Sequence, residues 1–565
     1  MKRFSALFLM GAWGAVLMLG QAPQKEATAS SPLPALRKAG QTVQMIVDGK
    51  PYLMLAGELH NSSASSAAYM RPIWEKLAGL HLNTVIGTAS WELVEPVEGK
   101  FDFSAVDSEI AEARRHGMRL VLIWFGTWKN ASSSYVPMWV KRDAARFPVA
   151  RTKSGKPGFM GLPIDALSPL GEHTIAADAK AFRALMRHIR EVDPRHTVIM
   201  VQVENETGLL GDSRDRSTIA EAAWAQPVPA ELMSYLAQHK ATLLPEVTRV
   251  WGAQGFKTAG TWAEVFGTDA FADEIFMAWF VGHAVGKVAE AGKAELAIPM
   301  YANAWLGPQP AQDRPGQYPS GGPVTGMLDI WRAAAPKLDL FAPDIYVADF
   351  QGVCAGYVRS GNPLFIPEAR ASLPNLFWAV GHHAALGYSP FGIEDLHDFK
   401  ALGAAYETLA GLAPLLLKAQ AEGKVGAVME GNSASVTAFE EATGLGVRFG
   451  GLRALFAPPA SKKDQQKDLP PAPAPDVDFS IKPEKDTRGF AVAIETAPHE
   501  LVIVGSGLLL TSGRAHIGTI DEGRFENGMW HPGRRLNGDE SFSGNFVMLG
   551  TEIPEIRKVV TYTEP

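Results

Sequence analysis

The sequence predicts an α/β protein, a (β/α)8 TIM barrel followed by an all-β, sandwich-like domain. The main observation is that eight short apolar segments alternate with longer helical segments between residues 41 and 420, which is the count of such a barrel. Segments such as 197–203 (TVIMVQV) are continuously apolar, which is typical of parallel strands buried on both faces. No G-x-G-x-x-G loop follows the first segment, so a doubly wound dinucleotide-binding sheet is the weaker interpretation.

The expected barrel strands are 52–55, 84–87, 120–124, 197–203, 297–302, 340–342, 364–366 and 387–391. The expected helices between them include 67–80, 105–115, 175–192, 271–291 and 398–419. In the helix 105–115, Val106, Ile110 and Ala113 recur at helical spacing and predict the buried face.

From about residue 424 the pattern changes to short β-prone segments with turn residues between them, which is the spacing of a β-sandwich. The expected strands are 425–429, 434–439, 489–495, 500–504 and 515–519. The stretch 457–475 is rich in Pro, Lys, Gln and Asp and predicts a mobile loop. These boundaries divide the chain into a leader (1–29), a catalytic barrel (30–420) and a C-terminal β domain (421–565).

Residues 1–29 have the pattern of a secretory signal peptide, because Lys2 and Arg3 precede an apolar run that ends in small residues. We therefore expect export to the periplasm or the medium, with no stable membrane insertion after cleavage. The 53 basic and 60 acidic residues give a net charge of −7, which disfavours a nucleic-acid partner. The single cysteine, Cys354, excludes an intrachain disulfide and a cysteine-based zinc site.

Polar residues at the carboxyl ends of the expected strands are candidates for catalysis, because barrel enzymes place their active sites there. Carboxylates, tryptophan and asparagine dominate these ends, and the chain has no G-x-S-x-G, P-loop or H-E-x-x-H motif. Aromatic rings stack on sugar rings, while Asn, Glu and Lys bond hydroxyl groups. Glycoside hydrolysis needs two carboxyl groups, and Glu206 and Glu368 follow the fourth and seventh strands.

Five segments in order resemble glycoside hydrolase family 35. They are WELVEPVEGKFDF (91–103), WFGTWKNASSSY (124–135), VQVENETG (201–208), FIPEAR (365–370) and DEGRFENGMWHPGRRLNGDE (521–540). Thr207 departs from the family pattern, which has an aromatic residue after V-E-N-E. The resemblance implies a retaining exo-β-galactosidase without cofactor or metal, in which Glu206 is the general acid/base and Glu368 the nucleophile.

By the same resemblance, Asn205 bonds the sugar 2-hydroxyl and Tyr346 orients the nucleophile. Because residues two apart on a strand share a face, Glu204 is expected to be a substrate ligand or a neighbour that raises the pKa of Glu206. Further candidates for substrate contact are Trp91, Trp128, Lys129, Asn130 and Trp305. For the three tryptophans, packing at the barrel top is an equal alternative.

The expected partner is an oligosaccharide or polysaccharide-derived glycan, with galactosylated xyloglucan fragments suggested by the resemblance. Two alternatives remain open: another retaining exo-glycosidase of the same clan, acting on β-arabinopyranosides or β-glucosides, and a glycan-binding protein with a decayed site. The sequence leaves the oligomeric state open, and a homo-oligomer is compatible with it.

Overall fold

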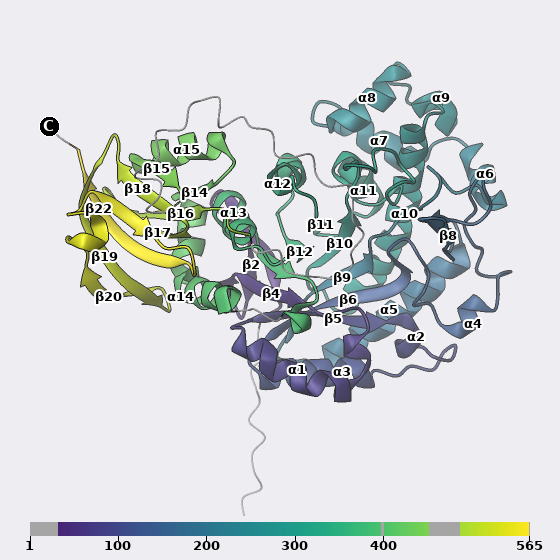
Figure 1. Cartoon of the computed structure of the whole chain (residues 1–565). Helices are drawn as coiled ribbons and strands as arrows, with labels where there is room; N and C mark the ends of the chain where they lie inside the picture. The colour runs from purple at the N-terminus through teal and green to yellow at the C-terminus, as the bar shows by residue number, and fades with distance from the viewer. Residues whose placement is uncertain (1–31, 397–399, 451–485, 564–565) are drawn as a thin grey trace, which may run out of the picture.

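The structure, a computed structural model, describes residues 32–396, 400–450 and 486–563. Its larger part is a closed barrel of eight parallel strands (Figure 1). In chain order the strands are β4 (Met54–Glu58), β5 (Thr84–Ser90), β6 (Arg119–Lys129), β9 (Val198–Asn205), β10 (Met300–Trp305), β11 (Leu340–Ile345), β12 (Ile366–Ala369) and β13 (Gly387–Pro390). Each expected barrel strand overlaps one of these, so the predicted fold class is confirmed.

Helices surround the barrel, and the five expected ones are present. The principal outer helices are α1 (Ala67–Gly79), α3 (Ser104–Arg115), α5 (Glu172–Val192), α10 (Ala270–Lys293), α11 (Leu328–Ala334), α12 (Phe350–Val358), α13 (Leu373–His383) and α14 (Lys400–Glu422). Between β9 and α10 the chain adds α6 (Thr218–Trp224), α7 (Ala230–His239), α8 (Pro245–Ala253) and α9 (Trp262–Phe266). In the described part of the chain, no helix has the length and apolarity needed to cross a bilayer.

A small antiparallel sheet precedes the barrel and covers one of its ends. It consists of β1 (Ala35–Ala39), β2 (Thr42–Val47) and β3 (Lys50–Tyr52). Met45 and Val47 of β2 pack into the apolar cluster inside the barrel. The expected strand 52–55 merged β3 with β4, because the break between them at Leu53 lies within one apolar run.

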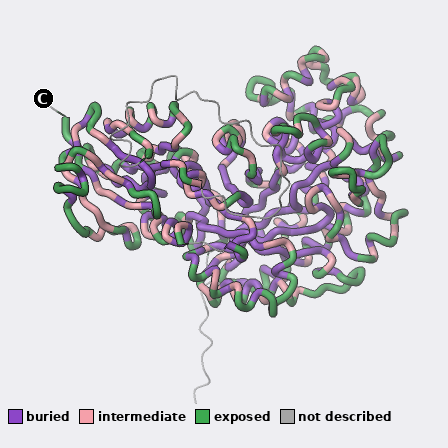
Figure 2. The backbone as a smooth tube through the Cα atoms, in the orientation of Figure 1, coloured by how far each residue is buried: buried purple, intermediate pink, exposed green. Residues whose placement is uncertain are grey.

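The barrel interior is apolar below and polar at its mouth. Residues two apart along a strand face the same side, so the inward positions can be followed upward from the apolar cluster inside the barrel. Figure 2 shows the backbone of the central part of the barrel as buried. On β4, Met54 and Ala56 belong to that cluster and Glu58 follows them. On β11, Leu340 and Ala342 belong to it and Asp344 follows. The carboxyl ends of these strands therefore carry acids above an apolar floor.

The C-terminal region forms two further sheets, at the left of Figure 1. The six-stranded sheet has the order β14 (Val425–Met429), β16 (Phe490–Ala497), β17 (Glu500–Ser506), β22 (Glu555–Tyr562), β19 (His516–Glu526) and β20 (Met529–Arg535). The three-stranded sheet has the order β15 (Leu445–Phe449), β18 (Leu508–Ser512) and β21 (Phe546–Leu549). Both sheets contribute to one apolar core, as expected of a sandwich.

The prediction of a strand at 434–439 is wrong, because these residues lie in the helix α15 (Ser433–Thr443). The Asn432 side chain accepts a hydrogen bond from the Ser435 backbone N–H and so caps the first turn. Gly444 ends the helix in the left-handed region, with φ of 73°. Val436 and Phe439 are three residues apart and pack together on the sandwich core, a spacing that the β-prone composition concealed.

The sandwich is attached directly to the barrel through α13 and α14. Phe377 of α13 stacks on Phe490 of β16, with ring centroids 4.8 Å apart. Asp486, just before β16, accepts a hydrogen bond from the Ser372 hydroxyl at 2.6 Å. Arg488 donates to Asn375 Oδ1 at 2.8 Å and pairs with Asp486. The expected leader (1–29) and the expected mobile loop (457–475) lie outside the described residues.

Candidate active site

Four carboxyl groups from four different strands meet at the mouth of the barrel. Glu58 is the last residue of β4, Asp344 lies on β11 and Glu368 on β12, and Glu206 directly follows β9. Asp344 and Glu368 are paired in register on neighbouring strands. All four side chains are buried, and the electrostatic influence of Glu368 extends to each of the other three.

The backbone around Glu206 is held from two sides. Its N–H donates to Asn303 Oδ1 at 2.9 Å, and its carbonyl accepts from the Ala131 N–H at 3.0 Å. Asn303 in turn donates through Nδ2 to Asp344 Oδ2 at 2.5 Å. Glu206 itself has φ of 45°, a left-handed conformation that is uncommon for a residue other than glycine. The surrounding hydrogen bonds maintain this conformation, which turns the strand end at the acid.

The environment of Glu206 favours its protonated form. Burial is the main cause and the neighbouring charge of Glu368 the second, and together they raise the pKa of Glu206 to about 8. Lys129 and a hydrogen bond from Asp344 oppose this rise. A carboxyl group with such a pKa keeps its proton at neutral pH and is suited to act as a general acid.

Glu368 has a different environment. It is 8% exposed, and its Oε1 accepts a hydrogen bond from the Tyr346 hydroxyl at 2.7 Å. The Tyr346 residue is 40% exposed, so its ring borders open space beside the bound carboxylate. Burial and the Glu368 charge raise the pKa of Tyr346, which keeps the phenol protonated as a donor. This hydrogen bond is compatible with the orienting role that the family resemblance implied for Tyr346, and that role stays a prediction.

Asn205 has hydrogen-bonding capacity that the protein does not use. Its side chain is buried, and neither the amide nitrogen nor the amide oxygen has a hydrogen-bond partner. A buried amide without partners costs free energy, so the arrangement is favourable only when a ligand supplies the missing bonds. The Thr207 hydroxyl, one residue beyond Glu206, is likewise buried and without a partner.

Lys129 and Asn130 also belong to this site. Lys129 lowers the pKa values of Glu58, Glu206 and Asp344, so its ammonium group faces the acids. The ammonium group also donates to Asn130 Oδ1. The Asn130 N–H donates to the Asn205 carbonyl at 3.2 Å, which attaches this loop to the end of β9.

The prediction for Glu204 is wrong. Its carboxylate accepts from the backbone N–H groups of Thr127 and Trp128, at 3.1 and 2.6 Å, and lies beside Asp178 of α5. It is not among the causes of the Glu206 pKa shift. The reason is that both Glu204 and Glu206 have positive φ angles, so the regular alternation of a strand does not hold here.

Two of the three tryptophans are packing residues, and the prediction that they contact substrate is wrong for them. Trp91 is fully buried and donates to Glu95 Oε2 at 3.0 Å. Trp128 is buried in the main core and donates to the Leu167 carbonyl at 3.2 Å. Trp305 is half-buried at the end of β10 and remains a candidate for substrate contact.

Sequence reasoning missed Glu58. The signal was present, because Glu58 is the last residue of the first barrel strand and Glu368 the next-to-last residue of the seventh. In the described ranges, no group of three or more His, Cys, Asp or Glu residues has the geometry of a metal site.

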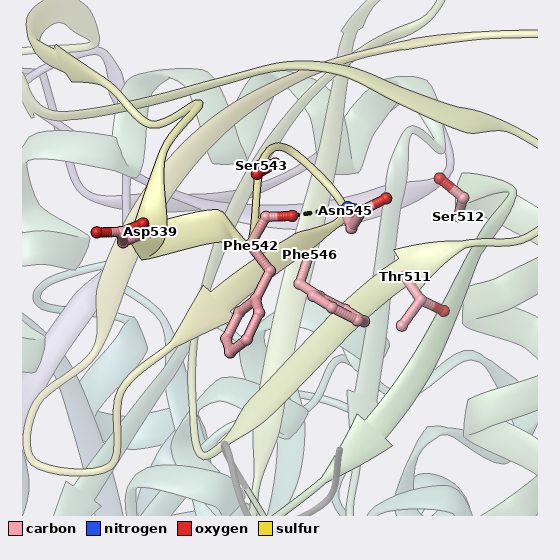
Figure 3. Close-up of a pocket in the computed structure, with 7 residues that line it drawn as sticks. All are labelled: Thr511, Ser512, Asp539, Phe542, Ser543, Asn545 and Phe546. Carbon is pink, nitrogen blue, oxygen red and sulfur yellow. Dashed lines mark hydrogen bonds between the residues drawn. The ribbon is translucent and has the colours of Figure 1, made fainter. Parts of the chain in front are cut away.

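An open cavity of about 730 Å³ lies in the sandwich, away from the barrel mouth. It is lined by Thr511, Ser512, Asp539, Phe542, Ser543, Asn545 and Phe546 (Figure 3). None of its lining residues belongs to the carboxylate cluster.

Comparison with known proteins identifies the type of barrel. Residues 66–269 match the β-galactosidase family that is glycoside hydrolase family 42. A curated β-galactosidase from Xanthomonas manihotis is 31% identical over 205 residues, which are 35% of this chain and 31% of that protein. Over these residues the barrel is therefore similar in sequence to β-galactosidases. The chain spans about a third of the length of that relative. The matched model is that of family 42, so the assignment to family 35, a different family, stays a prediction.

The remaining matches concern the rest of the chain and the shape. Residues 402–548 match a domain of unknown function, which begins within α14 and so includes the last barrel helix together with most of the sandwich. A β-galactosidase structure from Bacillus circulans sp. alkalophilus has a TM-score of 0.44 at 14% identity, covering 65% of this chain and 57% of that one. The catalytic domain of β-amylase from Paenibacillus polymyxa has a TM-score of 0.40 at 14% identity, covering 61% and 93%.

Proposed function

We propose that this protein is a retaining exo-β-galactosidase of glycoside hydrolase family 35 that releases terminal, non-reducing β-linked galactose. The observation that carries the proposal is the contrast between its two central carboxyl groups. Glu206 is held protonated, with a pKa of about 8, while Glu368 accepts a hydrogen bond from Tyr346. One acid and one oriented carboxylate are what a glycosidase requires.

In the proposed first step, the Glu368 carboxylate attacks the anomeric carbon while Glu206 donates its proton to the glycosidic oxygen. The bond between the anomeric carbon and that oxygen breaks, the aglycone leaves as an alcohol, and an ester forms between the sugar and Glu368. In the second step Glu206, now ionised, takes a proton from water as that water attacks the anomeric carbon. The ester breaks, and both carboxyl groups return to their first state.

The unused hydrogen-bonding groups support a sugar as the ligand. Asn205 presents both a donor and an acceptor to the site, which suits the 2-hydroxyl group of a pyranose. Oligosaccharides derived from plant polysaccharides, such as galactosylated xyloglucan fragments, are the proposed substrate class. Export to the periplasm is part of the proposal and rests on the pattern of residues 1–29.

The decisive experiment is a panel of nitrophenyl β-galactoside, β-glucoside, β-arabinopyranoside and their α-anomers. We expect the β-galactoside to have the highest kcat/KM, and proton NMR of the first-formed sugar to reveal the β-anomer. Preference for a β-arabinopyranoside or β-glucoside would redirect the proposal to another exo-glycosidase of the clan. An α-anomeric first product would contradict retention, and binding of galactosides without turnover would indicate a decayed, glycan-binding protein.

A further inference from the structure

Glu58 has no role in the two-step reaction, yet it lies among the residues that do. It is 1% exposed and ends β4 on the inward side, above Met54 and Ala56 of the apolar cluster. Its Oε1 atom is buried and has no hydrogen-bond partner. A buried carboxyl oxygen without a partner is costly, so a purely structural role for Glu58 would be an unfavourable one.

The neighbours of Glu58 indicate that it faces the substrate space. Glu368, Lys129 and Glu206 act on it electrostatically, in that order, followed by Glu394. Oε1 of Glu394 accepts from the His60 N–H and the Ser63 hydroxyl, whereas its buried Oε2 has no partner. Glu58 thus faces the catalytic pair, and the group that would satisfy its free oxygen has to come from the space between them.

We propose that Glu58 is a specificity-determining residue that accepts a hydrogen bond from one hydroxyl group of the sugar bound between Glu206 and Glu368. This inference rests on the proposed glycosidase function and deepens it by naming a sugar ligand outside the two reacting groups. Asn205 lies on β9 and Glu58 on β4, so the two are expected to hold different hydroxyl groups. The Lys129 ammonium group supplies a positive charge that acts on the Glu58 carboxyl.

The test compares the wild-type enzyme with Glu58→Gln on nitrophenyl β-galactoside and on its 2-, 3-, 4- and 6-deoxy analogues. The matched control is Glu109→Gln, because Glu109 is also a fully buried carboxyl but lies on the outer helix α3 against Gly87. We expect Glu58→Gln to lower kcat/KM for the full substrate by about 10- to 100-fold, since the amide places an NH2 donor where the carboxyl has an oxygen and leaves the sugar hydroxyl group without its acceptor. The control is expected to stay within about 3-fold.

The decisive result is the pattern across the analogues. If Glu58 bonds one hydroxyl group, the wild-type enzyme discriminates against the analogue lacking that group, and Glu58→Gln loses this discrimination while keeping it against the others. An equal loss on every analogue, or no loss at all, would overturn the proposal. Should Glu58→Gln fail to give a cooperative thermal transition, Glu58→Asp is tested on the same panel, with the same pattern required.

The failure of Glu58 and the failure of the proposed function can be told apart. If wild-type protein cleaves no glycoside of the first panel, the proposed function is wrong, and calorimetric titration with free D-galactose, D-glucose and L-arabinose then tests Glu58. Binding to the wild type that weakens at least 10-fold in Glu58→Gln would support the role in sugar binding. Unchanged binding, or no binding to the wild type, would overturn it.

Discussion

The buried acids at the mouth of the barrel and the half-buried acid at its junction with the sandwich have opposite environments. At the mouth, Glu58 keeps a buried oxygen without a partner, and burial raises the pKa values of Glu58 and Asp344. At the junction, Asp486 has its own arginine, Arg488, and accepts the Ser372 hydroxyl, and these bonds lower its pKa.

This difference in hydrogen bonding distinguishes an acid that stabilises the junction from acids that are available for chemistry at the barrel mouth. An ion pair whose hydrogen bonds are all made contributes little net stability, and it has no free hydrogen-bonding group for a ligand. A group of acids with unmade hydrogen bonds lowers the free energy of unfolding, and burial of the large apolar core of the barrel compensates for this loss. The same acids provide protons and hydrogen-bond acceptors for a ligand. The four predictions below test this contrast, from the largest expected effect to the smallest.

Replacing Glu368 by alanine should have the largest effect on activity. Without the carboxylate no ester intermediate can form, so kcat on nitrophenyl β-galactoside should fall by about 10⁴-fold or more. Thermal unfolding of the variant should match or exceed that of the wild type, since a buried acid is removed. A 2-deoxy-2-fluoro galactoside with a good leaving group should label Glu368 in the wild type, and a label mapped to Glu58 or Glu206 instead would contradict its role.

Replacing Glu206 by alanine should have an effect that depends on the leaving group. Substrates with poor leaving groups need the proton, and we expect their turnover to fall by about 10²- to 10⁴-fold. Activated aryl galactosides should lose less in the first step, and added azide should restore turnover as β-galactosyl azide. The same loss for both substrate classes, without an azide product, would argue against Glu206 as the acid/base.

The pH dependence of kcat/KM should be set by the acids at the barrel mouth and not by the acid at the junction. Glu206 must be protonated to act as the acid, and its pKa is raised to about 8, so kcat/KM should fall as the pH rises through about 8. Because the folded state retains a proton that an ordinary glutamate releases near pH 4.5, Glu206 also makes stability decrease with rising pH between these values. Glu206→Gln should flatten both dependences, whereas a wild-type profile without an alkaline limb near pH 8 would contradict the assignment.

Replacing Asp486 by asparagine should affect stability with little effect on chemistry. The change weakens the bonds to Arg488 and Ser372, and we expect a loss of about 1–2 kcal/mol in the free energy of unfolding. The kcat on aryl galactosides should change less than about 3-fold. The control is Arg534→Ala, which breaks an exposed pair with Glu522 and should leave the free energy of unfolding nearly unchanged. A loss of activity comparable to that of Glu206→Ala would mean that the junction takes part in positioning Glu368.

Several features could be predicted from the sequence because they depend on local pattern. The eight strands, the main helices, and Glu206 and Glu368 as strand-end acids followed from apolar periodicity and from the rule that barrel enzymes use the carboxyl ends of their strands. The position of Tyr346 beside Glu368 followed from the family resemblance. The strands, the helices and the strand-end acids are properties of single segments, whereas the place of Tyr346 came from the resemblance alone.

Other features depend on how segments meet, and only the tertiary structure decided them. Glu204 turned away from the site because the positive φ angles of Glu204 and Glu206 break the alternation of the strand, and because a glycine at position 126 leaves room for Glu204 beside Asp178. Trp91 and Trp128 entered the core, since burying a large ring contributes more free energy than leaving it at the mouth. The raised pKa of Glu206 and the unpartnered oxygen of Glu58 depend on neighbouring residues from other strands. The sequence of a single strand does not specify those neighbours.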